Sequence, residues 1–141
     1  MKRLNTDGAS RRDVTAGCGG LFRNGEGKWL GGFSRNLGRS NACIAELCGG
    51  FYGLRLARDR GFSKVELHVD SSVIVHKLHS NKDESVVGWR LIQEIRRLLS
   101  LEWEINVYHS YREANLCVDA LANMGCDHGP GCVFMSSALL G

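Results

Sequence analysis

The sequence predicts a single α/β domain in which helices pack on the faces of a mixed β-sheet. The spacing of polar and apolar residues gives the element order β-β-β-α-β-α-α-β-α. An antiparallel meander comes first and strand–helix–strand crossovers follow, which is typical of a mixed sheet covered by helices. The 141 residues suit one domain with its own core, and the chain shows no internal repeat.

The N-terminal part of the chain is predicted to form three strands. Residues 2–7 alternate polar and apolar side chains, as a strand with one buried face does. Residues 14–36 are predicted to form a hairpin, because apolar and small residues lie on both sides of Asn24-Gly25. Asn-Gly is among the strongest short signals for a hairpin turn.

The first helix is predicted over residues 41–60, where apolar residues recur at helical spacing. They are Ile44, Leu47, Cys48, Phe51 and Leu54. A second row along this helix is nearly all small: Glu46, Gly50, Gly53 and Ala57. Each helical glycine costs about 1 kcal/mol relative to alanine, so glycines at 49, 50 and 53 require a packing reason. We expect Gly61 to end the helix.

The rest of the chain alternates between the two kinds of element. Strands are predicted at 63–69 and 102–109, and helices at about 70–79, 86–100 and 112–125. Gly125 is expected to close the last helix. The sequence thus predicts one domain over residues 1–125 and, because no strong period follows, a loose tail over 126–141.

The composition is that of an ordinary globular protein and disfavours several other classes. No apolar run is long enough to cross a membrane, and the N-terminus lacks the apolar core of a secretory signal. We therefore expect an intracellular protein that is not secreted. The six cysteines form no C-x-x-C pair and are expected to be reduced. The net charge of +3 fits a polyanionic partner without demonstrating one.

Asp7 is the first of four acids whose positions suggest chemistry. It lies directly before Gly8 at the end of the first predicted strand. Asp-Gly is a common turn dipeptide, because Asp bonds its own backbone and Gly accepts positive φ. The alternative is a carboxylate held at the edge of a sheet, and the dipeptide alone does not decide between the two.

The other three acids also have ordinary structural explanations. Asp70 follows the predicted strand at 63–69, where it could cap a helix. Glu46 lies in the first turns of the long helix, where a negative charge is favourable. Asp119 lies inside the last helix, where Asp is a poor helix former and a surface position is usual.

The predicted topology could bring these acids together. The first strand of the meander can lie beside the first crossover strand, and ligands bind at the ends of such strands in open α/β sheets. Asp7 and Asp70 would then face each other, with Glu46 and Asp119 added by helices. Carboxylates so close repel one another, and a bound Mg²⁺ or Mn²⁺ would relieve the repulsion.

Three segments of the chain together resemble the plant type-1 ribonuclease H-like domain of retroelement-derived and stand-alone plant proteins. The segments are NTDGAS, AELCGGFYGLRLARDRGFSKVELHVDS and HSYREANLCVDALANM. The resemblance covers about residues 3–125. It implies a ribonuclease H-like fold, a five-stranded mixed sheet of order 3-2-1-4-5 flanked by helices, in agreement with the element order above.

The resemblance also implies an activity, which is cleavage of the RNA strand in an RNA–DNA hybrid by two Mg²⁺ ions. The metal ligands it implies are Asp7, Glu46, Asp70 and Asp119. His109 stands ten residues before Asp119 and matches a mobile histidine of the family, which could transfer a proton or help product release. A structural strand-end histidine is the alternative.

Nucleic-acid contacts are expected around the 2′-OH, which distinguishes RNA from DNA. The expected contacts are the backbone at Gly8 and Ser10, the side chains of Ser71 and Asn115, and Arg112 toward phosphate. One departure from the family is the stretch 12–15, where many members carry Gly-Asn-Pro-Gly. This change removes a rigid turn and adds an acid near the expected site.

Two other functional classes remain open at this point. One is a catalytically weak nucleic-acid-binding module derived from a retroelement, which the altered turn at 12–15 favours. The other is a DNA transposase or integrase of the same broad fold, whose motifs differ from those here. The intact acids favour the nuclease. We expect a monomer that acts on an RNA–DNA hybrid or another nucleic acid and contacts no membrane, in the nucleus or the cytoplasm.

Overall fold

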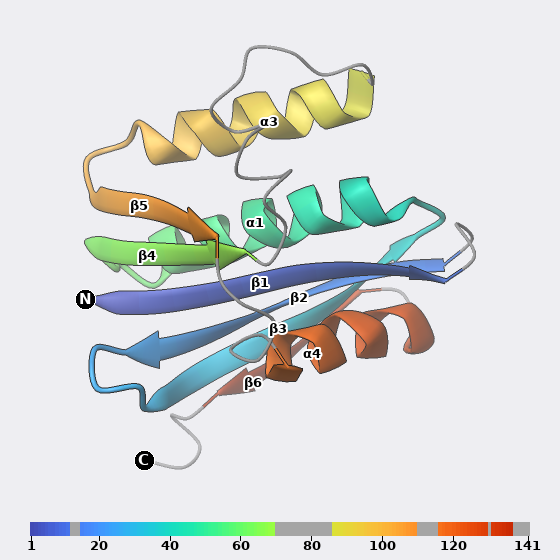
Figure 1. The fold of residues 1–141 in the computed structure, drawn as a ribbon, viewed down its shortest axis with the longest axis horizontal. Helices are drawn as coiled ribbons and strands as arrows, with labels where there is room; N and C mark the ends of the chain where they lie inside the picture. Colours follow the sequence, from blue (N-terminus) through green and yellow to red (C-terminus); the bar gives the residue numbers. More distant parts are fainter. Residues whose placement is uncertain (12–14, 70–85, 110–115, 130, 137–141) are drawn as a thin grey trace.

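The chain folds around a six-stranded mixed sheet, shown in a computed structural model that describes residues 1–11, 15–69, 86–109, 116–129 and 131–136 (Figure 1). The strands are β1 Lys2–Arg11, β2 Thr15–Asn24, β3 Trp29–Gly38, β4 Lys64–Val69, β5 Glu104–His109 and β6 Cys132–Ser136. The helices are α1 Ala42–Asp59, α3 Val86–Leu99 and α4 Leu116–Asp127. The predicted helix at 70–79 lies outside the described residues.

The strand order is β5-β4-β1-β2-β3-β6. The pairs β1–β2, β2–β3 and β3–β6 are antiparallel, whereas β1–β4 and β4–β5 are parallel. This confirms the meander followed by crossovers and the order 3-2-1-4-5 of the five central strands. The expected number of strands was wrong, because β6 lies within the segment expected to be a loose tail. This strand pairs with the outer edge of β3, which would otherwise be left open.

The two faces of the sheet carry different helices. Helix α1 covers one face and packs against α3, while α4 covers the other face over β1, β2 and β3 (Figure 1). The main hydrophobic core lies on the α1 side. Its largest fully buried members are Leu4, Leu47, Leu54, Leu67, Ile92 and Ile95. Each such side chain contributes roughly 1.5–3 kcal/mol when it leaves water, so this layer fixes α1 on the sheet.

Glycines let α1 approach β1 more closely than other residues would. A Cβ atom at Gly49 would lie 2.7 Å from the carbonyl oxygen of Asp7, and one at Gly53 would lie 2.9 Å from Cγ2 of Thr6. The close contact with β1 explains why glycine occurs at these two positions of the helix. Gly50 does not, because a Cβ there would meet only Ile95 of α3, at 3.8 Å. Gly50, unlike Gly53 of the same predicted row, therefore does not face the sheet.

The ends of α1 lie close to the predicted bounds, whereas α4 ends later than predicted. Asn41 caps α1, since its Oδ1 accepts from the Ile44 amide at 2.9 Å, and Gly61 beyond the helix has φ +74°. Gly125 was expected to close α4, but the helix continues to Asp127. A Cβ at Gly125 would lie 2.5 Å from the carbonyl oxygen of Arg35, so this glycine serves close packing on β3.

Two further observations concern the chain as a whole. All six cysteines are free, as expected for a reduced protein. In the part of the chain that the structure describes, no helix is both long and apolar enough to span a membrane.

Candidate active site

Asp7 is a buried acid in the middle of β1 rather than the start of a turn. The strand continues to Arg11, and Asp7 pairs with Gly19 of β2. Asp7 is only 6% exposed, and its Oδ1 accepts a hydrogen bond from the Gly8 amide at 2.8 Å. The turn interpretation of Asp7-Gly8 is therefore wrong, because both residues belong to a paired strand.

Gly8 lets the first turn of α1, which carries Glu46, lie directly on β1. A Cβ atom at Gly8 would lie 2.1 Å from the carbonyl carbon of Ala45 and 2.2 Å from the amide nitrogen of Glu46. The first turn of α1 therefore rests directly on the residue that follows Asp7. Glycine is required at this position because a helix backbone occupies the space of its missing side chain.

Asp119 approaches from the opposite face of the sheet. Residues paired directly across an antiparallel ladder point to the same face, so Asp7 and Gly19 both face α4. A Cβ at Gly19 would lie 2.7 Å from Cβ of Leu121, two residues after Asp119. Asp119 itself is exposed in the first turn of α4, where its charge is favourable.

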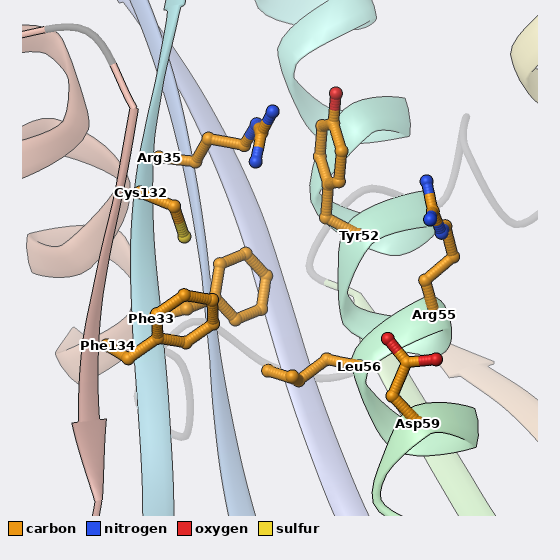
Figure 2. A pocket seen from close by; sticks show the side chains of 8 residues that line it. All are labelled: Phe33, Arg35, Tyr52, Arg55, Leu56, Asp59, Cys132 and Phe134. Carbon is orange, nitrogen blue, oxygen red and sulfur yellow. The ribbon is translucent and has the colours of Figure 1, made fainter.

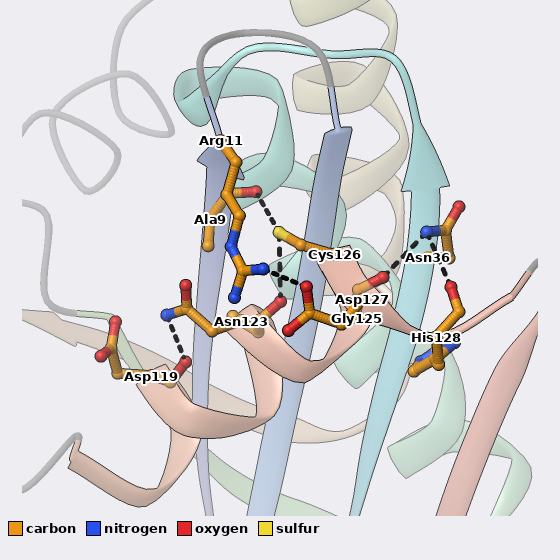
Figure 3. A network of polar contacts seen from close by, with 10 residues as sticks. Ala9, Arg11, Asn36, Asp119, Asn123, Gly125, Cys126, Asp127 and His128 are labelled. Atoms are coloured by element: carbon orange, nitrogen blue, oxygen red, sulfur yellow. Dashed lines mark hydrogen bonds and ion pairs between the residues drawn. The ribbon is translucent and has the colours of Figure 1, made fainter.

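Polar side chains of β3 hold α4 in place. Ser34 Oγ donates to the Leu121 carbonyl at 2.7 Å, and Asn36 Nδ2 donates to the Gly125 carbonyl at 2.9 Å and the His128 carbonyl at 3.3 Å. Figure 3 shows the contacts of Asn36 at the end of the helix. These residues could not be predicted from the sequence, since a polar strand side chain that bonds a helix carbonyl has no sequence period of its own.

The end of α4 is also tied to β1. Arg11 forms an ion pair with Asp127, and Cys126 Sγ donates to the Ala9 carbonyl at 3.6 Å (Figure 3). Both contacts involve the same strand that carries Asp7. The contacts of Cys126 with β1 and of Ser34 and Asn36 on β3 therefore anchor the C-terminal half of α4, which fixes the direction of its first turn and of Asp119. The ion pair between Arg11 and Asp127 is exposed and contributes little.

The parallel strands place His109 at the same edge. Thr6 of β1 pairs with Val69 of β4, which in turn pairs with His109 of β5. His109 is the exposed last residue of its strand. Asp70 follows Val69 directly in the chain, but it lies outside the described residues, as do Ser71, Arg112 and Asn115.

The two described nucleic-acid candidates already make structural contacts. Ser10 Oγ donates to the Ser40 carbonyl at 2.8 Å, which ties β1 to the loop before α1. The Gly8 amide donates to Asp7. Among the residues that the structure describes, no three His, Cys, Asp or Glu side chains lie together in a way that could hold a metal.

A comparison with protein families matches residues 5–125 to a family described as reverse transcriptase-like. The chain belongs to the reverse transcriptase-like family. This member is 43% identical over 122 residues to the Arabidopsis thaliana protein named "Putative ribonuclease H protein At1g65750". The match covers 86% of the chain but 20% of that protein, so the chain spans about a fifth of its length.

Solved structures place this reverse transcriptase-like chain among ribonucleases H by fold. RNase H1 of the archaeon Halobacterium salinarum superimposes with a TM-score of 0.83 at 29% identity, covering 89% of this chain and 97% of that one. The N-terminal RNase H domain of Rv2228c from Mycobacterium tuberculosis gives 0.82 at 26% identity, with 89% and 93% covered. LC11-RNase H1, solved in complex with an RNA/DNA hybrid, gives 0.81 at 23% identity, with 90% and 97% covered. These matches confirm the resemblance of the chain to a plant ribonuclease H-like domain and the predicted ribonuclease H-like fold.

Proposed function

We propose that the chain is an endonuclease that hydrolyses the RNA strand of RNA–DNA hybrids. The observation that carries the proposal is the close contact at Gly8, which fixes the start of α1, and with it Glu46, against the residue after the buried Asp7. A charged group buried in a protein is paired or coordinates a metal. Carboxylates from different elements that together hold two metal ions would suit hydrolysis of a phosphodiester.

The donor set fits a hard divalent cation chemically. Asp7, Glu46 and Asp119 offer carboxylate oxygens, which Mg²⁺ and Mn²⁺ prefer over nitrogen or sulfur. Asp70 is the fourth proposed ligand and follows the strand that pairs with β1. Two bound Mg²⁺ ions would neutralise phosphate charge and promote formation of a hydroxide nucleophile from water.

The remaining proposed residues act on the substrate or on protons. His109 would hold or deliver a proton at the scissile phosphate, a task suited to an imidazole near neutral pH. Backbone groups at Gly8 and Ser10 would contact the sugar-phosphate chain. The side chains of Ser71, Arg112 and Asn115 are proposed for the same purpose. One chain supplies all of these residues, so a monomer would suffice.

A cleavage assay with a labelled hybrid tests the proposal. The chain should cut the RNA strand in the presence of Mg²⁺ and should leave single-stranded RNA and duplex DNA intact. Glu46→Gln should lose this activity, because it removes a proposed ligand charge with little change in volume. Glu104→Gln is the matched control, since Glu104 is an exposed residue at the start of β5 whose ion pair with Lys64 contributes little.

The outcomes separate the nuclease from a catalytically weak binding module. Binding of the hybrid without cleavage at any Mg²⁺ or Mn²⁺ concentration would favour the binding module and overturn the nuclease. Equal cleavage by Glu46→Gln and Glu104→Gln would remove Glu46 from the proposed site.

A further inference from the structure

A groove lies between α1 and the strands β3 and β6, with a volume of about 310 Å³ (Figure 2). We call it the α1–β6 groove. None of the residues lining it belongs to the candidate active site. Its volume falls at the small end of the roughly 300–1,000 Å³ typical of ligand clefts. The β6 wall also lies beyond residues 5–125, the part of the chain that matches the family.

The strand wall of the groove is aromatic. Phe33 of β3 pairs in register with Phe134 of β6, and both line the groove. Phe33 is 1% exposed and is part of the core, whereas Phe134 is 58% exposed. In Figure 2 both rings project from their strands toward α1. An aromatic ring left this exposed beside a groove offers a surface on which a planar group can stack.

The positive charge of the groove comes from two arginines that lie over aromatic rings of α1. The Arg35 guanidinium of β3 lies over the Tyr52 ring of α1, with its Cζ 4.0 Å from the ring centroid (Figure 2). The Arg55 Cζ lies 5.5 Å from the centroid of the Phe51 ring. Such cation–π contacts orient a guanidinium while leaving its N–H groups able to bind an anion.

The charges of the groove favour an anionic occupant. Arg35 and Arg55 outnumber Asp59, the acid of the lining. Within the described part of the chain, no carboxylate forms an ion pair with either guanidinium. Burial raises the pKa of the Cys132 thiol, and Arg35 lowers it by a smaller amount, so this thiol adds no negative charge at neutral pH.

We propose that the α1–β6 groove binds single-stranded nucleic acid, with a base stacked on Phe134 and a phosphate held by Arg55 and Arg35. Aromatic platforms next to basic side chains are the usual means of holding single strands without sequence preference. A nucleotide combines the planar ring and the anion that the two walls suit. This activity goes beyond cleavage of a hybrid and does not depend on it.

The test measures binding of a labelled oligothymidylate of about 12 nucleotides, a length within the range of single-strand sites. Fluorescence anisotropy with the full chain, at fixed salt and with a metal chelator, gives the affinity. Phe134→Ser and Arg55→Gln should each weaken binding about tenfold, as expected when one stacked base or one phosphate contact is lost. Thermal melting of each variant checks that it is folded.

Two matched controls introduce the same residues, a serine and a glutamine, at positions outside the groove. Val133→Ser changes the neighbouring residue of β6, which is also exposed but does not line the groove. Arg60→Gln removes a charge at the C-terminal cap of α1. Both should bind the strand as the unmodified chain does. If they weaken binding as much as Phe134→Ser and Arg55→Gln, general charge explains the affinity and the proposal is wrong.

Other outcomes also decide the question. Absence of strand binding by the unmodified chain, or equal affinity in all four variants, would overturn the groove proposal. A mononucleotide that competes as strongly as the strand would also overturn it, by indicating a small-molecule site. Hybrid cleavage is a separate measurement, so failure of the nuclease proposal leaves the binding result interpretable.

Discussion

Gly49 of α1 lies so close to β1 that a Cβ atom on it would stand 2.7 Å from the carbonyl oxygen of Asp7. This contact joins the helix that carries Glu46 to the strand residue that carries the buried carboxylate. A backbone oxygen cannot move aside as a flexible side chain can. The distance between α1 and β1 at the candidate site is therefore set by the absence of one methyl group.

The first prediction compares two neighbouring glycines of this helix. Gly49→Ala should lower the free energy of unfolding by about 1–3 kcal/mol, because the methyl group overpacks the contact with Asp7. Gly50→Ala should raise it by up to about 1 kcal/mol, since its Cβ meets only Ile95 at 3.8 Å and alanine favours a helix. Urea unfolding of both variants measures the difference, and equal effects would contradict the packing described here.

The second prediction concerns the attachment of α4. Asn36→Ala removes two hydrogen bonds to the end of the helix and a third, from the Gly38 amide to Asn36 Oδ1, and should lower the free energy of unfolding by about 1–3 kcal/mol. Asn123→Ala is the control, because its side chain only bonds the Asp119 carbonyl on the exposed side of α4, at 3.0 Å. Chemical denaturation should show a much smaller loss for Asn123→Ala. A loss for Asn123→Ala as large as that for Asn36→Ala would mean that the hydrogen bonds of Asn36 contribute no more than an exposed one.

The third prediction is a pH dependence of stability. Burial raises the pKa of the Cys48 thiol from 9.0 to about 11, although Arg35 opposes the shift. Between these two pKa values the thiol loses its proton in the unfolded chain and keeps it in the folded chain. The contribution of Cys48 to stability is therefore fully present below pH 9 and is lost as the pH rises toward 11. Cys48→Ser should therefore lose less stability than the unmodified chain between about pH 8 and about pH 10, the range in which an unfolded thiol loses its proton.

The control for this measurement is Cys117→Ser, since Cys117 is exposed. Its melting temperature should fall between the two pH values as much as that of the unmodified chain. If Cys48→Ser falls equally, the Cys48 thiol does not contribute to alkaline destabilisation.

Much of the fold could be predicted from the sequence because its signals are local. The stripe of apolar residues in α1, the cap at Gly61 and the alternation in β4 and β5 each depend on neighbours in the chain. The sixth strand could not be predicted in this way. Its five residues form a strand by pairing with β3, a contact about a hundred residues distant in sequence.

The candidate site shows the same division. The acids could be singled out by their places in or after predicted strands and in predicted helices, but the reason for Gly8 could not be predicted. Its role depends on the approach of Ala45, which only the packed structure reveals. Ser34 and Asn36 were missed for the same reason, since they act through carbonyl groups of α4. Gly125 was misjudged because a glycine that ends a helix and one that packs closely look alike in sequence.

The fourth prediction concerns His109, the exposed last residue of β5. If it moves a proton or aids product release, His109→Ala should lower turnover roughly 10- to 100-fold, at the modest end of acid–base effects. The Mg²⁺ concentration required for half-maximal activity should barely change, because Mg²⁺ prefers oxygen ligands. Unchanged turnover with a lower melting temperature would instead assign His109 a purely structural role.

If the buried Asp7 carboxylate serves hybrid cleavage, Asp7→Asn should abolish cleavage without unfolding the chain. The substitution keeps the volume and removes the charge, so the variant should fold and melt at or above the temperature of the unmodified chain. Asp127→Asn is the matched control, because it loses only an exposed ion pair with Arg11. With a labelled RNA–DNA hybrid and Mg²⁺, we expect cleavage by Asp127→Asn and none by Asp7→Asn; cleavage by Asp7→Asn at the unmodified rate would contradict the account.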